Sequence, residues 1–178
     1  MQRIKAINPK TATGKTKALL ARIQKTHGEI SNMMHTMANS PVVLEGFLKF
    51  SDAIAGGTLS TRLREQIALA VAEVNDSQYC ISLHTAGAKS LGLSEDDLTA
   101  CRRFASTDPM EEAALQFTFR LVMNRGETSA LDLERVRRAG FSDAEIVEII
   151  ANVALNIFAN YFNKVAGVAV DSPVKGNR

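Results

Sequence analysis

The amino-acid sequence predicts an all-α protein that forms a single helical domain over residues 1–178. Two observations favour this class. Strand-type alternation of apolar and polar residues is nearly absent, and apolar residues recur with helical spacing from residue 15 to residue 166. The composition, 46% hydrophobic and 22% charged, is typical of a globular chain that is long enough to bury a core.

The first three helices are expected in the N-terminal third of the chain. A helix over residues 15–27 has an apolar inner face and ends at Gly28. A short helix or turn follows at residues 32–37. Ser40 and Pro41 then provide an N-cap and a first helical residue, and the helix that they open ends at a pair of glycines.

The next two helices carry the residues with chemical interest. The helix over residues 61–74 is apolar all round from Ile67 to Ala72, a pattern that indicates burial on most sides. Asn75 and Asp76 break it, and Ser77 is expected to cap the helix that follows. That helix ends before Gly92.

Four further helices follow, and each begins at a capping residue. Three are preceded by a serine, and one is opened by an aspartate followed by proline. The helices are expected at about residues 94–104, 109–124, 129–138 and 142–165. The ends of the chain, residues 1–14 and 168–178, are expected to be flexible or extended.

The charge distribution is uneven, although the net charge is only +2. Seven basic residues precede the first acidic residue, Glu29. Because no aromatic side chain interleaves with these cations, we interpret the segment as a solvated helix with no nucleic-acid or membrane partner. Two cysteines are too few for a secreted disulfide framework, and no signal peptide or long apolar run is evident, so the sequence predicts a cytoplasmic protein.

Cys80 is the first candidate for a catalytic residue. With Ser77 as N-cap, Cys80 occupies the third position of its helix, where unpaired backbone N–H groups favour an anion such as a thiolate. Ser77 Oγ is expected to accept a hydrogen bond from the Cys80 N–H. Tyr79 places a hydroxyl beside the cysteine. The alternative is that Cys80 is a small core residue.

His84 and Glu65 are the expected partners of this thiol. His84 lies four residues after Cys80, so the two side chains share one helical face and the imidazole can take the thiol proton. Glu65 lies near the start of an apolar helix and needs a partner there; the alternative partners are Arg62 and Arg64. Cys80 and His84 supply only two ligands, so no metal or cofactor is expected.

A stripe of asparagines marks one face of the last helix. Its members are Asn152, Asn156, Asn160 and Asn163. Buried amides must be hydrogen-bonded, so the favoured interpretation is a structural or interface ladder. The alternative is that one or two of them line the active site, and Asn160 is the member expected to support it.

Three segments carry a resemblance to a known superfamily. They are Leu59 to His84, Gly28 to Pro41, and Asn160 to Gly167. The sequence resembles the alkylhydroperoxidase D and carboxymuconolactone decarboxylase superfamily, in its peroxidase-related branch. The resemblance implies an all-helical, cofactor-free domain that assembles as a trimer or hexamer.

By this resemblance Cys80 is the peroxide-reactive cysteine, and Glu65 and His84 are its proton relay. Ser77 stands where the family has the second cysteine of a redox pair, so that disulfide cannot form, and the place of Cys101 stays open. The function implied is a single-cysteine thiol peroxidase with a hydroperoxide as substrate. An external thiol, or a cysteine from another subunit, would reduce it.

The missing second cysteine leaves two alternatives open. One is a lyase of the decarboxylase kind that acts on a small carboxylated lactone, with Arg64 holding the carboxylate. The other is a helical binding protein without catalytic activity.

Overall fold

The structure, a computed structural model, describes residues 2–171, and within that range the chain forms nine α-helices and no β-strand. The helices are α1 (Gly14–His27), α2 (Asn32–Met37), α3 (Pro41–Ala55), α4 (Thr61–Val74), α5 (Gln78–Ser90), α6 (Glu95–Arg102), α7 (Pro109–Met123), α8 (Ala130–Arg138) and α9 (Asp143–Ala166). The predicted all-α class is confirmed, and each predicted helix is found at its predicted place.

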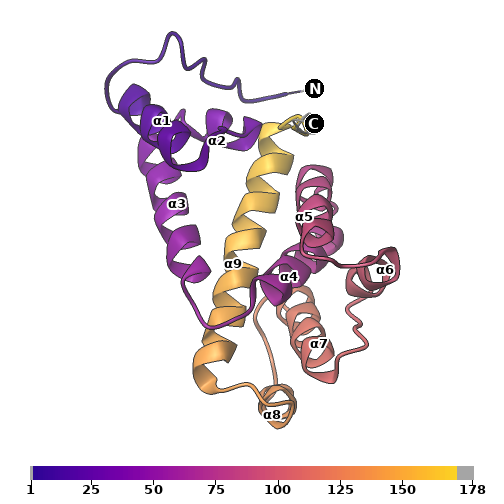
Figure 1. Ribbon diagram of the computed structural model, residues 1–178. Coiled ribbons are helices and arrows are strands. Elements are labelled where there is room, and N and C mark those ends of the chain that lie inside the picture. Colours follow the sequence, from indigo (N-terminus) through magenta and orange to yellow (C-terminus); the bar gives the residue numbers. More distant parts are fainter. Residues whose placement is uncertain (1, 172–178) are drawn as a thin grey trace.

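The long helix α9 is the axis of the molecule (Figure 1). Helices α1 to α3 lie on one side of it, α4 to α7 lie on the other, and α8 lies near its N-terminal end. Helix α4 packs against α5, α6, α7 and α9, which places it at the centre of the fold. The segment Ile67 to Ala72 is at most 3% exposed, as its all-round apolar pattern predicts.

Most of the predicted helix caps form. The hydroxyls of Ser40 and Ser60 accept the expected backbone N–H groups, and Ser94 with Asp97 makes the predicted capping box. Ser77 is the exception, because its side chain makes no capping hydrogen bond. In the tight turn before α5 its backbone N–H donates to Ala72 and its side chain is buried, 1% exposed, with Oγ unpaired among the described residues.

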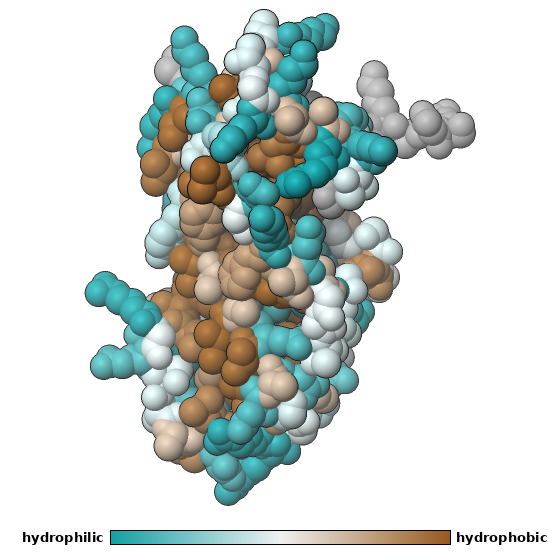
Figure 2. Space-filling view, turned by 90° about the vertical axis from the view of Figure 1, so that its left-hand side faces the viewer, coloured by the Kyte–Doolittle hydropathy of each residue, from teal (hydrophilic) through white to brown (hydrophobic). Residues whose placement is uncertain are grey.

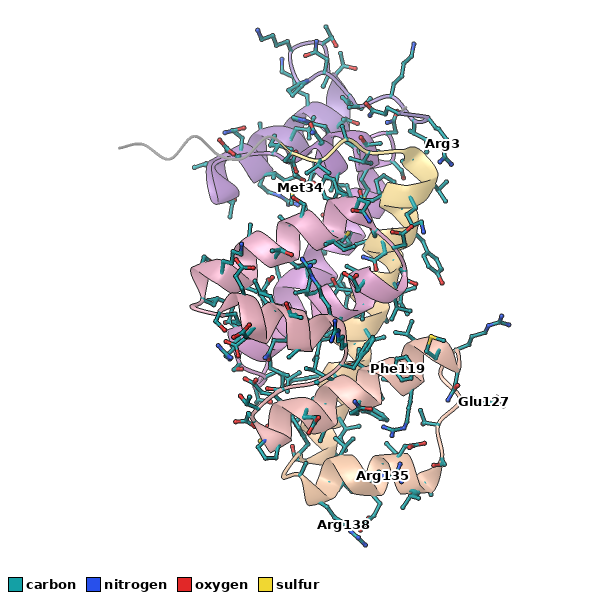
Figure 3. The ribbon with its side chains drawn as sticks, turned by 90° about the vertical axis from the view of Figure 1, so that its right-hand side faces the viewer. Arg3, Met34, Phe119, Glu127, Arg135 and Arg138 are labelled. Carbon is teal, nitrogen blue, oxygen red and sulfur yellow. The ribbon has the colours of Figure 1, made fainter. Side chains whose placement is uncertain are left out.

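The N-terminal segment lies across the end of α9. The N–H groups of Arg3 and Ile4 both donate to the Ala166 carbonyl, and Ile7 N–H donates to the His35 carbonyl. Figure 3 shows Arg3 beside the C-terminal end of α9. Residues 2–13 are therefore attached to the fold as a non-helical segment with a turn at residues 9–11, while residues 1 and 172–178 of the predicted ends lie outside the described part.

Helix α9 is long and apolar enough, by length and composition, to meet a criterion for a membrane span. Its 24 residues nevertheless carry four buried asparagines, and the helix packs against α3, α4, α5 and α7. The apolar character of α9 is therefore that of a core helix.

Candidate active site

A cavity of about 380 Å³ lies between α2, α3, α4, α5 and α9. The three predicted catalytic residues, Glu65, Cys80 and His84, all line it. The rest of the wall is mostly apolar, with Met33, Met34, Phe47, Ile54, Ala55, Ala68, Leu83, Leu155 and Ala159. Figure 3 shows Met34 where α2 meets α5. Two consecutive helices, α4 and α5, thus bring a carboxylate, a thiol and an imidazole to one apolar pocket.

Glu65 and His84 form a pair across α4 and α5. Glu65 Oε2 lies 3.0 Å from His84 Nδ1. A carboxylate only accepts, so Nδ1 carries the proton of the neutral ring and Nε2 keeps its lone pair. Arg62, one of the alternative partners of Glu65, instead pairs with Glu111 at 2.9 Å. The geometry is that of a histidine oriented by a carboxylate.

Cys80 lies at the third position of α5 and is only 1% exposed. The hydrogen bond at its sulfur comes from Asn163, whose Nδ2 lies 3.3 Å from Cys80 Sγ. The same amide nitrogen lies 3.3 Å from Met33 Sδ. The expected bond between the Cys80 N–H and Ser77 Oγ is not formed. The sulfur is thus held by α9 rather than by the turn before its own helix.

Three predicted supporting residues do not line the cavity. Ser77 is buried with no hydrogen-bond partner for Oγ among the described residues. The hydroxyl of Tyr79 donates to Asp171, and burial first and this bond second raise the pKa of Tyr79 above its ordinary value. Asn160 accepts from Asn75 Nδ2 at 3.0 Å. Tyr79 and Asn160 thus tie α5 and α9 to neighbouring segments.

Other members of the asparagine stripe do reach the site. Asn152 and Asn156 line the cavity, and their amide nitrogens donate to the carbonyls of Glu148 and Asn152 one turn earlier. Asn163 contacts the Cys80 sulfur. The spacing of the stripe pointed to one helical face, and the contact of Asn163 with a residue 83 positions away was not visible in it.

Among the residues that the structure describes, Arg64 is the one basic side chain besides His84 in the cavity wall. Its guanidinium donates to the Leu59 carbonyl and to Thr61 Oγ1. Cys101 lies elsewhere: it is fully buried, and Sγ donates to the Gln66 carbonyl at 3.1 Å. Burial and then the Glu111 carboxylate raise the pKa of Cys101 to about 12, so this thiol stays protonated at neutral pH.

Comparison with known proteins gives a consistent picture. Residues 41–119 match the sequence pattern of the Carboxymuconolactone decarboxylase family. The structure of an uncharacterized peroxidase-related protein from Ralstonia eutropha, an alkylhydroperoxidase AhpD core, has a TM-score of 0.83 at 23% identity, over 96% of this chain and 93% of that one. A peroxidase-related protein from Silicibacter has a TM-score of 0.82 at 21% identity, over 99% and 96%.

A third solved structure adds a bound ligand. The debrominase Bmp8, as a cysteine-to-alanine variant in complex with 2,3,4-tribromopyrrole, has a TM-score of 0.78 at 20% identity, over 95% of this chain and 91% of that one. A search of curated protein sequences gives no match. Residues 41–119 thus match the carboxymuconolactone decarboxylase family, and the fold along the chain is that of alkylhydroperoxidase D-like, peroxidase-related proteins.

Proposed function

We propose that the protein is a single-cysteine, thiol-dependent oxidoreductase that reduces hydroperoxides, with Cys80 as the nucleophile. One observation carries the proposal: Cys80, His84 and Glu65 line the same apolar cavity, and the carboxylate orients the imidazole from 3.0 Å. This is the arrangement of a nucleophile with a base and an orienting group.

In the first half-reaction His84 Nε2 takes the thiol proton and Cys80 Sγ attacks the distal oxygen of the hydroperoxide. The O–O bond breaks, an S–O bond forms, and Cys80 becomes a sulfenic acid. The leaving alkoxide takes the proton back from His84 and departs as an alcohol. Glu65 stabilises the imidazolium that exists between the two proton transfers.

In the second half-reaction an external thiol reduces the sulfenic acid. The thiol forms a mixed disulfide with Cys80 and water leaves; a second thiol then releases Cys80 and carries away the disulfide. Ser77 has no sulfur to offer, and Cys101 is fully buried and bonded to the Gln66 carbonyl. A small dithiol, or a cysteine of another subunit, is therefore the reductant.

The test is hydroperoxide consumption with dithiothreitol as reductant, measured for the wild-type protein, Cys80→Ser and Cys101→Ala. Wild type and Cys101→Ala should turn over, and Cys80→Ser should not. Mass spectrometry of the peroxide-treated protein should place the oxidation on Cys80. Equal turnover by Cys80→Ser and wild type would refute the proposal.

A second candidate is the reductive dehalogenation of a small halogenated ring, supported by the fold shared with the debrominase and by the apolar cavity wall. Cys80 Sγ would take the bromine as the C–Br bond breaks, and His84 would protonate the ring carbon. A thiol would then displace bromide from sulfur, and a second thiol would reduce the mixed disulfide. Two thiols are oxidised, and the products are the hydrogenated ring and HBr.

Bromide release from 2,3,4-tribromopyrrole with dithiothreitol decides between the two reactions. Release that depends on Cys80, with slow hydroperoxide consumption, favours dehalogenation. The decarboxylase-like lyase differs from both reactions in needing no thiol. Its proton transfer would use His84, and Arg64 would hold the substrate carboxylate. Lactone turnover retained in Cys80→Ser would therefore select the lyase.

A further inference from the structure

The amide of Asn163 lies in an unusual place for a polar group. Asn163 is 3% exposed, and its Nδ2 faces two sulfur atoms, Cys80 Sγ and Met33 Sδ, at 3.3 Å each. Its Oδ1 is buried with no hydrogen-bond partner among the described residues. Sulfur is a weak acceptor in thiols and thioethers. In the resting protein this amide therefore makes weaker hydrogen bonds than it would make with water.

A buried amide with poor partners calls for an explanation other than stability. A residue of similar volume without polar atoms, such as leucine, would fill the same space without leaving an oxygen unpaired. The Nδ2 donor gains a strong partner when Cys80 is ionised. A donor gains most when its acceptor is an anion, because charge-assisted hydrogen bonds are stronger than neutral ones.

The Cys80 sulfur needs such a donor. It is 1% exposed, so donors to a thiolate must come from the protein rather than from bulk water. The cap that the sequence predicted at Ser77 does not form, which removes one means of ordering the start of α5. The amide of Asn163 is the hydrogen-bond donor that the structure places on Sγ.

We infer that Asn163 is a catalytic residue: its Nδ2 donates a hydrogen bond that stabilises the Cys80 thiolate and holds Sγ toward the cavity. The inference rests on the proposed function, in which Cys80 is the nucleophile. It adds a fourth residue, from α9, to the three that line the cavity. When Cys80 is a neutral thiol, Oδ1 is available to accept the S–H proton after rotation of the amide.

The other charged groups near the sulfur are few. Arg64 and Glu65 of α4 and His84 of α5 line the cavity with Cys80. The stretches of α2, α3 and α9 that line it contribute no ionisable side chain. Glu65 is paired with His84, and Asn163→Leu removes the donor to the sulfur without adding or removing a charge.

The test is a titration of the thiolate by its ultraviolet absorbance, with the spectrum of Cys80→Ser subtracted. Asn163→Leu removes the donor at similar volume, and the thiolate fraction near neutral pH should fall about tenfold to a hundredfold, as expected for a hydrogen bond to a charged group. The isosteric Asn163→Asp places an acceptor beside the sulfur and should lower the thiolate fraction at least as much. This variant replaces Asn163→Leu in the titration if the leucine variant does not fold.

Thr118→Val is the matched control. Thr118 is fully buried in α7 with an unpaired hydroxyl among the described residues, and it lies outside the cavity wall. Its titration should match that of the wild type. A titration of Asn163→Leu that superimposes on the wild-type curve would overturn the inference.

The two proposals fail separately. If the wild-type protein consumes neither a hydroperoxide nor a brominated pyrrole, the proposed function fails, while the absorbance titrations still decide the role of Asn163. If turnover depends on Cys80 but the titration does not respond to residue 163, the function stands and the inference falls.

Discussion

The carboxylate of Glu65 occupies the space that a side chain at Gly87 would fill. A Cβ atom added at Gly87 would lie 2.7 Å from Glu65 Oε2 and 3.1 Å from its Cδ. Gly87 lies three residues after His84 on α5, so the absence of a side chain there lets the carboxylate approach the imidazole. The Glu65–His84 pair thus depends on a third residue, Gly87, because it has no side chain.

Gly87→Ala should separate the carboxylate from the imidazole. Glu65 is flexible enough to move away, so the fold should persist, and turnover should drop by about tenfold or more because general acid–base catalysis contributes about 10²–10⁴. Steady-state turnover and thermal unfolding are measured together. Gly46→Ala, in an open helical position of α3, is the matched control and should keep full turnover. Unchanged turnover in Gly87→Ala would mean that the pair is not used.

Glu65→Gln should lower turnover with little effect on folding, because glutamine keeps the shape but cannot stabilise an imidazolium. A loss of about 10²-fold is expected from general acid–base catalysis. The measurement is a pH–rate profile. Glu73→Gln is the control on the same helix, since Glu73 pairs with Arg102 outside the cavity. A Glu65→Gln profile equal to wild type would contradict the relay.

Cys101 should make the protein less stable in alkaline solution. An unfolded thiol ionises near pH ~8.5, whereas the pKa of Cys101 in the fold is about 12. Between these values only the unfolded chain releases the proton, so stability is full below the lower value and falls by about 1.4 kcal/mol per pH unit above it. Denaturant unfolding across this range should show a shallower fall for Cys101→Ala. Parallel curves for the two proteins would contradict this account.

Glu148 should stabilise the turn between α3 and α4. Its carboxylate accepts the N–H groups of Thr58 and Leu59 and the Thr58 hydroxyl, at 2.8 to 3.0 Å. These bonds, first that of the Thr58 N–H, lower the pKa of Glu148. The stabilisation is present above the unfolded pKa and is lost as pH falls through the lowered one. Glu148→Gln should therefore lower the melting temperature at neutral pH and much less in strong acid; an equal decrease at both would refute it.

An exposed apolar surface on α9 fits the homo-oligomer that the sequence resemblance predicts. Val147, Ile150, Phe158, Tyr161 and Val165 are between 42% and 63% exposed. Figure 2, which views the side where α1 and α3 lie, shows hydrophobic side chains gathered along the middle and lower part of that face. Exposed patches of this kind mark interaction sites, and we expect a second copy of the chain to cover this one.

Ile150→Glu tests this expectation. Sedimentation should show an assembly for wild type and a smaller species for the variant, because a buried carboxylate without a partner is costly. The control is Glu127→Gln, at a polar surface position near the end of α7, seen in Figure 3. A monomeric wild-type protein would contradict the predicted oligomer.

The sequence by itself determined the helices and most of their caps, and it pointed to three candidate catalytic residues that all line the cavity. These features depend on short-range order: a helix repeats every 3.6 residues, so spacing alone places His84 on the face of Cys80. Capping likewise depends on residues within one turn.

The tertiary structure decided which face of each helix meets which neighbour. It paired Glu65 with His84 rather than with an arginine, and it placed Asn163, not Asn160, against the Cys80 sulfur. It also turned Ser77 into the core instead of capping α5. Such contacts follow from the packing of whole helices, in which neighbours 19 or 83 residues apart meet, and no local periodicity encodes them.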